Sequence, residues 1–139
     1  MKEGARLLLV EDEELIGQLL EQVLKGGGLE VRRVSSCVEA LRALRAEAFD
    51  LCLTDFMLPD GTGLEVARGA PATLKVILMS AFLEPELEAQ IKVEPRVVSV
   101  LRKPMDIFEL RRRVQEVLEG PPLTGDRKVA EGSPGPGSA

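Results

Sequence analysis

The sequence of 139 residues contains no histidine, no tryptophan and no tyrosine, and its only aromatic side chains are four phenylalanines. Without histidine, a Ser-His-Asp triad, a Cys-His dyad and a histidine-bound zinc site are all excluded. No apolar run approaches the roughly 18 residues of a membrane-spanning helix, and acidic residues follow the first apolar run too closely for a signal peptide. The chemistry of this protein therefore has to use carboxylates, hydroxyls, lysine or cysteine.

Cysteine is also scarce, since the chain has only Cys37 and Cys52. Their separation does not fit a CxxC motif, and companion ligands for a metal site are missing. Two thiols in a chain without a signal sequence fit a reducing compartment, so we expect a cytoplasmic location. Cys52 lies in an apolar run and is expected to be a small buried hydrophobic residue. Cys37 stands at a predicted helix start, where a reactive thiol is the alternative to a structural one.

Acidic residues outnumber basic ones, 23 against 18, which gives a net charge of −5. Such a chain is poorly suited to direct contact with nucleic acid. The length fits one domain, and a hydrophobic content of 45% is enough for one core. Proline and glycine concentrate near the C-terminus, so we expect a folded domain over 1–120 and a flexible tail or linker stub over 121–139. The sequence leaves open whether the chain is a stand-alone protein or part of a longer one.

Short apolar runs alternate with segments of helical hydrophobic spacing. Strands are predicted at 7–10, 29–34, 51–54, 76–79 and 97–101. Helices are predicted at 15–24, 36–48, 63–68, 85–93 and 106–118. This alternation predicts an α/β fold, a three-layer α/β/α sandwich around a five-stranded parallel sheet.

Local signals define the ends of these helices. Three glycines at 26–28 predict the end of the first helix, and they are not a phosphate-binding loop, which would follow a strand and precede a helix. Ser36 and Asp106, each with a glutamate three residues later, predict helix N-caps. The inward face of the second helix is expected to consist of Val38, Leu41, Leu44 and Ala48.

Polar residues stand where four of the predicted strands end, namely Glu11 and Asp12, then Asp55, Ser80 and Lys103. Ligands of an open α/β sheet bind beyond the carboxyl ends of its strands, so these side chains are expected to share one rim. Two carboxylates about 4 Å apart repel by roughly 4 kcal/mol at an effective dielectric of 20. A hard cation such as Mg²⁺ relieves that repulsion, a lysine and a hydroxyl suit a phosphoryl group, and a carboxylate can itself be the nucleophile.

Each of these residues alone has a structural interpretation. Acids at 11–14 are common in the first turn of a helix, where the helix dipole favours them. Asp55 precedes a turn-forming segment, 59–61, and could be part of that turn. Ser80 and Lys103 singly are more often structural than functional. Their joint placement at the strand ends favours a binding site.

The chain resembles a two-component response regulator receiver domain over about residues 5–119. The segments that carry the resemblance are Val10-Glu11-Asp12-Glu13, Thr54-Asp55-Phe56-Met57-Leu58-Pro59-Asp60-Gly61, Met79-Ser80-Ala81 and Lys103-Pro104. The resemblance implies a flavodoxin-like fold with strand order 2-1-3-4-5 and a cis peptide bond before Pro104. It also implies a phosphorylation-controlled signalling switch rather than an enzyme.

The resemblance assigns a role to each site residue. Asp55 would accept a phosphoryl group from a sensor histidine kinase or a phosphotransfer protein. Mg²⁺ would be held by Glu11, Asp12, Asp55 and the main-chain carbonyl of Met57, and it is the only cofactor implied. Ser80 would donate a hydrogen bond to the phosphoryl group, and Lys103 would form an ion pair with it. The downstream protein is not identified, and homodimerisation stays open.

The chain departs from the family pattern at Val100, where an aromatic residue is usual, and in a third helix shortened by Gly69 and Pro71. A pseudo-receiver, which is an interaction module of the same fold that is not phosphorylated, is therefore an alternative. A Mg²⁺-dependent hydrolase of the haloacid dehalogenase kind is a weaker alternative, because such enzymes need a second aspartate where this chain has Met57.

Overall fold

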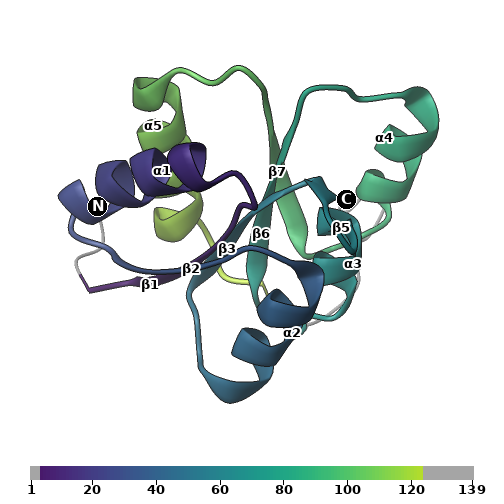
Figure 1. Ribbon diagram of the computed structural model, residues 1–139. Coiled ribbons are helices and arrows are strands. Elements are labelled where there is room, and N and C mark those ends of the chain that lie inside the picture. The colour runs from purple at the N-terminus through teal and green to yellow at the C-terminus, as the bar shows by residue number, and fades with distance from the viewer. Residues whose placement is uncertain (1–3, 124–139) are drawn as a thin grey trace.

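A five-stranded parallel sheet runs through the middle of the computed structural model, which describes residues 4–123 (Figure 1). In order across the sheet, its strands are β2 (Glu30–Val34), β1 (Arg6–Val10), β3 (Leu51–Asp55), β6 (Lys75–Ser80) and β7 (Val97–Arg102). Counted along the chain, this is the order 2-1-3-4-5. The predicted fold class and strand order are therefore confirmed. Most of the predicted tail at 121–139 lies outside the described residues.

Helices cover both faces of the sheet, which gives the predicted three layers (Figure 1). One face carries α1 (Glu14–Gly26) and α5 (Ile107–Glu119), and the other carries α2 (Cys37–Ala46), α3 (Gly63–Arg68) and α4 (Pro85–Lys92). Successive strand residues point to opposite faces. In β1, for example, Leu8 packs under α2 and α3, whereas Leu7 packs under α1 and α5. The near-continuous apolar strands are the consequence of this two-sided burial.

A short hairpin follows β3, formed by β4 (Met57–Leu58) and β5 (Gly61–Thr62). Its two strands are antiparallel and pair Met57 with Thr62 and Leu58 with Gly61. The sequence predicts no strand between residues 55 and 62, because strands of two residues are too short to show a periodic pattern. The hairpin connects the end of β3 directly to the start of α3.

The predicted N-caps at Ser36 and Asp106 and the predicted end of the first helix are confirmed. The hydroxyl of Ser36 accepts a hydrogen bond from the amide of Glu39, and the carboxylate of Asp106 accepts one from the amide of Phe108. Helix α1 ends at Gly26, and Gly28 adopts a positive φ of 93°, which is the backbone conformation that glycine tolerates best.

The predicted inward face of α2 was wrong at two positions. Val38 is 49% exposed, and Ala48 is exposed and lies beyond the end of the helix at Ala46. The buried positions of α2 are Cys37, Ala40, Ala43 and Leu44. The packed face therefore includes two small alanines beside Leu44, which a search for large apolar side chains overlooks.

Both cysteines are buried free thiols. Burial raises the pKa of Cys52 to about 12. Burial, and then the charges of Asp60 and Glu65, raise the pKa of Cys37 to about 11. Both thiols are therefore protonated at neutral pH, which favours the structural interpretation of Cys37. Within the described residues, no helix is long and apolar enough to cross a membrane.

Candidate functional site

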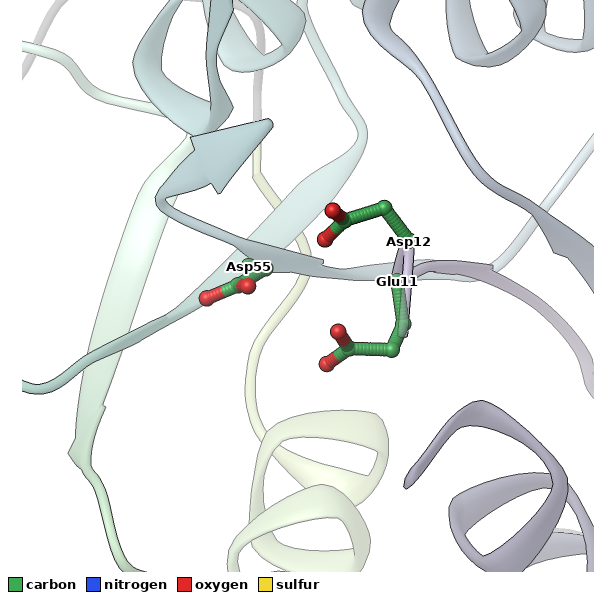
Figure 2. A group of neighbouring side chains, drawn as sticks. All are labelled: Glu11, Asp12 and Asp55. Atoms are coloured by element: carbon green, nitrogen blue, oxygen red, sulfur yellow. The ribbon is translucent and has the colours of Figure 1, made fainter. Parts of the chain in front are cut away.

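Three carboxylates meet at the carboxyl end of the sheet. Glu11 and Asp12 directly follow β1, and Asp55 is the last residue of the neighbouring strand β3. Each offers an oxygen atom, and these atoms all lie within 4.8 Å of one another. Figure 2 shows the side chains of Glu11 and Asp12 extending from the end of β1 toward the side on which Asp55 lies. Glu11 is fully buried and Asp55 is 8% exposed, whereas Asp12 is open to solvent.

Lys103 brings a positive charge to this acidic group from the end of β7. Its Nζ lies 3.1 Å from Oδ1 of Asp55 and 3.6 Å from Oε1 of Glu11. The backbone amide of Lys103 donates a hydrogen bond of 2.9 Å to the carbonyl of Ser80, which fixes the start of this loop against β6. The bond between Lys103 and Pro104 is cis, as the resemblance implied.

The site has three carboxylates and one lysine, and the pKa values of the buried groups are shifted from their ordinary values. Burial raises the pKa of Glu11, although the amide of Glu13 and the charge of Lys103 oppose the effect. Burial also raises the pKa of Asp55, again against Lys103. For Lys103, burial lowers the pKa, but the hydrogen bond and charge of Asp55 outweigh it, so that its pKa is raised. The ionised carboxylates therefore carry a free-energy cost that one lysine does not remove.

The donor set fits a hard divalent cation. Among the described residues, Oε1 of Glu11 is the one buried side-chain polar atom without a hydrogen-bond partner, and its distance of 3.6 Å from Lys103 is too long for a hydrogen bond. A small group of carboxylate oxygens with one open side is the arrangement that Mg²⁺ uses, because it keeps several waters or phosphate oxygens as further ligands. The geometry therefore supports the predicted metal site.

Ser80, at the end of β6, turns its hydroxyl toward the following loop. Its Oγ donates a hydrogen bond of 2.5 Å to the carbonyl of Phe82 and accepts one of 3.3 Å from the amide of the same residue. The side chain of Phe82 is 79% exposed. The structure therefore brings Ser80 to the predicted rim, with its hydroxyl engaged by the β6–α4 loop.

Two further positions shape the site on the side of the β4–β5 hairpin. Met57, two residues after Asp55, has a 68% exposed side chain and a backbone fixed by pairing with Thr62. A Cβ atom at Gly63 would lie 2.5 Å from the carbonyl oxygen of Asp55, so α3 can begin this close to the site only with glycine. Gly63 was not among the site residues predicted from the sequence. The sequence feature that could have identified Gly63 is its position directly after Thr62, which is the N-cap of α3.

A family model for the response regulator receiver domain matches residues 7–115. The chain is 34% identical over 118 residues to the response regulator protein PilR of Pseudomonas aeruginosa, covering 81% of this chain and 26% of PilR. It is 31% identical over 120 residues to the response regulator receiver protein CpdR of Brucella abortus, covering 81% of this chain and 96% of CpdR. The chain thus spans about a quarter of one curated relative and nearly all of the other.

A solved structure with the same fold contains a metal. The receiver domain of the sensor histidine kinase PA1611 from Pseudomonas aeruginosa PAO1, with a magnesium ion coordinated in its active-site cleft, has a TM-score of 0.75 to this chain. The two are 26% identical, and the match covers 84% of this chain and 99% of that domain. Taken with the strand order and the acidic rim, the match over residues 7–115 shows that the chain belongs to the response regulator receiver domain family.

Proposed function

We propose that this receiver domain is a phosphorylation-controlled signalling switch in which Asp55 accepts a phosphoryl group. The observation that carries the proposal is the position of Asp55, which is 8% exposed, has Lys103 Nζ at 3.1 Å and shares one space with the carboxylates of Glu11 and Asp12. A buried turn residue needs no such surroundings. The donor would be the phosphohistidine of a sensor histidine kinase or a phosphotransfer protein, since this chain has no histidine of its own.

The proposed transfer is a substitution at phosphorus. A carboxylate oxygen of Asp55 attacks the phosphorus atom, the bond from phosphorus to the donor's imidazole nitrogen breaks, and the electron pair remains on that nitrogen. Lys103 then pairs with the phosphoryl oxygens, and Ser80 turns from Phe82 to donate its hydroxyl hydrogen to one of them. We propose a switch and not a multiple-turnover enzyme, because a hydrolase with an aspartate nucleophile of the haloacid dehalogenase kind needs a second aspartate where this chain has Met57.

Mg²⁺ would be held by Glu11, Asp12, Asp55 and the main-chain carbonyl of Met57. When bound, it supplies positive charge that neutralises the carboxylates and the incoming phosphoryl oxygens. The raised pKa values of Glu11 and Asp55 and the unsatisfied oxygen of Glu11 support this proposal. We propose that the receiver unit comprises residues 1–120, and that its phosphorylation shifts a two-state equilibrium by about 1–3 kcal/mol, the usual range for coupled sites.

Beryllofluoride, which mimics a phosphoryl group on an aspartate, tests the proposal. Amide spectra of the wild-type protein should change when beryllofluoride and Mg²⁺ are added together. They should not change when sodium fluoride replaces beryllofluoride, or when EDTA removes the Mg²⁺. Asp55→Asn should show no change, because it lacks the attacking oxygen. If the wild-type spectrum does not change on addition of beryllofluoride at saturating Mg²⁺, the proposal is contradicted and a pseudo-receiver is favoured. Steady release of phosphate from added phosphoesters would instead indicate an enzyme.

A further inference from the structure

A further carboxylate, that of Asp60 in the hairpin that follows β3, has a partner far away in the sequence. Asp60 lies in the turn of the β4–β5 hairpin, and its Oδ1 accepts a hydrogen bond of 2.7 Å from the amide of Cys37. Its Oδ2 accepts another, of 3.0 Å, from the amide of Val38. These amides belong to the first turn of α2, 23 and 22 positions earlier in the chain. The hairpin is thus joined to the N-terminus of a helix on the same face of the sheet.

This connection is more than a cap for α2. Helix α2 already has its own N-cap, because the hydroxyl of Ser36 accepts a hydrogen bond of 3.2 Å from the amide of Glu39. Asp60 satisfies the two preceding amides of the same turn, and its negative charge is favoured at the positive end of the helix dipole. Two groups therefore share one helix end, and only one of them belongs to the hairpin.

Other contacts hold the same two segments together. The thiol of Cys37 donates a hydrogen bond of 3.4 Å to the carbonyl of Thr62 in β5. A Cβ atom at Gly61 would lie 2.8 Å from the sulfur of Cys37 and 2.7 Å from Oε1 of Glu65. The approach is therefore so close that a Cβ atom at Gly61 would require the Cys37 sulfur and the Glu65 carboxylate to shift. The hairpin rests against α2 at its turn and along β5.

Through the hairpin, this contact reaches the metal site. Thr62 pairs with Met57, and Gly61 pairs with Leu58. The backbone that α2 holds is thus the direct partner of the backbone that presents the Met57 carbonyl. We infer that Asp60 is a positioning residue for the Met57 carbonyl, which it holds in place for Mg²⁺ by anchoring the hairpin to the first turn of α2. This inference rests on the proposed function, because it assigns Asp60 a role only if Met57 is a metal ligand.

Two variants at the same helix end separate positioning from capping. Asp60→Ala and Ser36→Ala each remove a side-chain acceptor from the first turn of α2, so both should lower resistance to urea without metal. Only Asp60→Ala frees the hairpin. We expect its affinity for Mg²⁺, measured by calorimetric titration, to fall about 10-fold, as when a metal ligand loses its supporting partner. Ser36→Ala should bind Mg²⁺ as the wild type does.

Asp60→Asn serves as the conservative variant, since its amide oxygen still accepts one of the two hydrogen bonds. It should recover part of the lost affinity, and the amide resonance of Met57 should move on Mg²⁺ addition by an amount between those of the wild type and Asp60→Ala. Equal affinity in the wild type and Asp60→Ala would overturn the inference, as would equal losses in Asp60→Ala and Ser36→Ala. If the wild type itself binds no Mg²⁺, the proposed function fails first and the inference with it.

Discussion

Nζ of Lys103 lies 3.1 Å from Oδ1 of Asp55, although the strands that these residues end, β7 and β3, are separated in the sheet by β6. The lysine spans the end of β6, which itself contributes Ser80 to the same rim. Removal of the Lys103 ammonium group would leave Asp55 beside the carboxylates of Glu11 and Asp12 without this positive partner. The first predictions follow from this imbalance of charge.

Lys103→Ala should lower the free energy of unfolding, measured in urea without Mg²⁺ at neutral pH, by about 2 kcal/mol. The reason is that a hydrogen bond to a charged group of this kind contributes roughly 1.5–3 kcal/mol. Added Mg²⁺ should restore part of the loss, because it supplies the missing positive charge. Lys25→Ala is the control, since Lys25 pairs with Glu21 at 3.0 Å on the surface, and its removal should cost less than about 1 kcal/mol. A loss of the same size in both variants would contradict the account.

Asp55→Asn should raise the free energy of unfolding at neutral pH in the absence of Mg²⁺. Burial raises the pKa of Asp55, so the folded protein binds this proton more tightly than the unfolded chain does. The penalty of ionisation is therefore complete above the folded-state pKa and vanishes as the pH falls through that pKa toward the ordinary value of 3.8. The stability difference between Asp55→Asn and the wild type should shrink over the same acidic range. A difference that is independent of pH would argue against a buried, ionised Asp55.

Ser80→Ala should leave Mg²⁺ affinity unchanged but slow phosphoryl gain from acetyl phosphate at least about 10-fold, because a hydrogen bond to the charged phosphoryl group contributes roughly 1.5–3 kcal/mol in the transition state. It should also cost about 1 kcal/mol of stability, because the amide and carbonyl of Phe82 lose their partner. Ser80→Thr keeps the hydroxyl and should recover the rate. If Ser80→Ala is phosphorylated at the wild-type rate, the proposed role of the hydroxyl is wrong.

Gly63→Ala should destabilise the protein by about 2 kcal/mol, within the usual range of 1–3 kcal/mol for overpacking. Its Cβ atom would lie 2.5 Å from the carbonyl oxygen of Asp55, and a backbone atom cannot move aside easily. Gly26→Ala is the matched control, because a Cβ atom there would have no neighbour within 4 Å apart from the backbone of its own helix; it should be neutral or slightly stabilising. Urea unfolding of both variants provides the comparison, and similar midpoints would show that the close approach at Gly63 does not matter.

The sequence was informative wherever parallel strands end. The carboxyl ends of parallel strands share one edge of the sheet, so residues directly after them converge whatever lies between. For this reason Glu11, Asp55, Ser80 and Lys103 could be placed together from the sequence, and the structure brings them to one rim. The helix caps at Ser36 and Asp106 were predictable for a different reason, since each is a local arrangement within a few residues.

Other features depend on packing between distant segments. The hydrogen bond from the Cys37 amide to Asp60 joins residues 23 positions apart, and no sequence pattern in either segment predicts it. The buried face of α2 likewise includes the small side chains of Ala40 and Ala43, which the spacing of large apolar residues does not indicate. The hydroxyl of Ser80 faces Phe82 because of the path of the β6–α4 loop. Such features arise only when distant segments come together in the fold.

The most direct test of the central claim is to locate the acyl phosphate. The wild-type protein is incubated with acetyl phosphate and Mg²⁺, the product is reduced with borohydride, and peptides are analysed by mass spectrometry, with Asp55→Asn and an EDTA-treated sample beside it. We predict conversion of Asp55 to homoserine in the wild type with Mg²⁺, and no conversion in either control. An unmodified Asp55 in the folded wild-type protein, or modification that persists without Mg²⁺, would contradict the account.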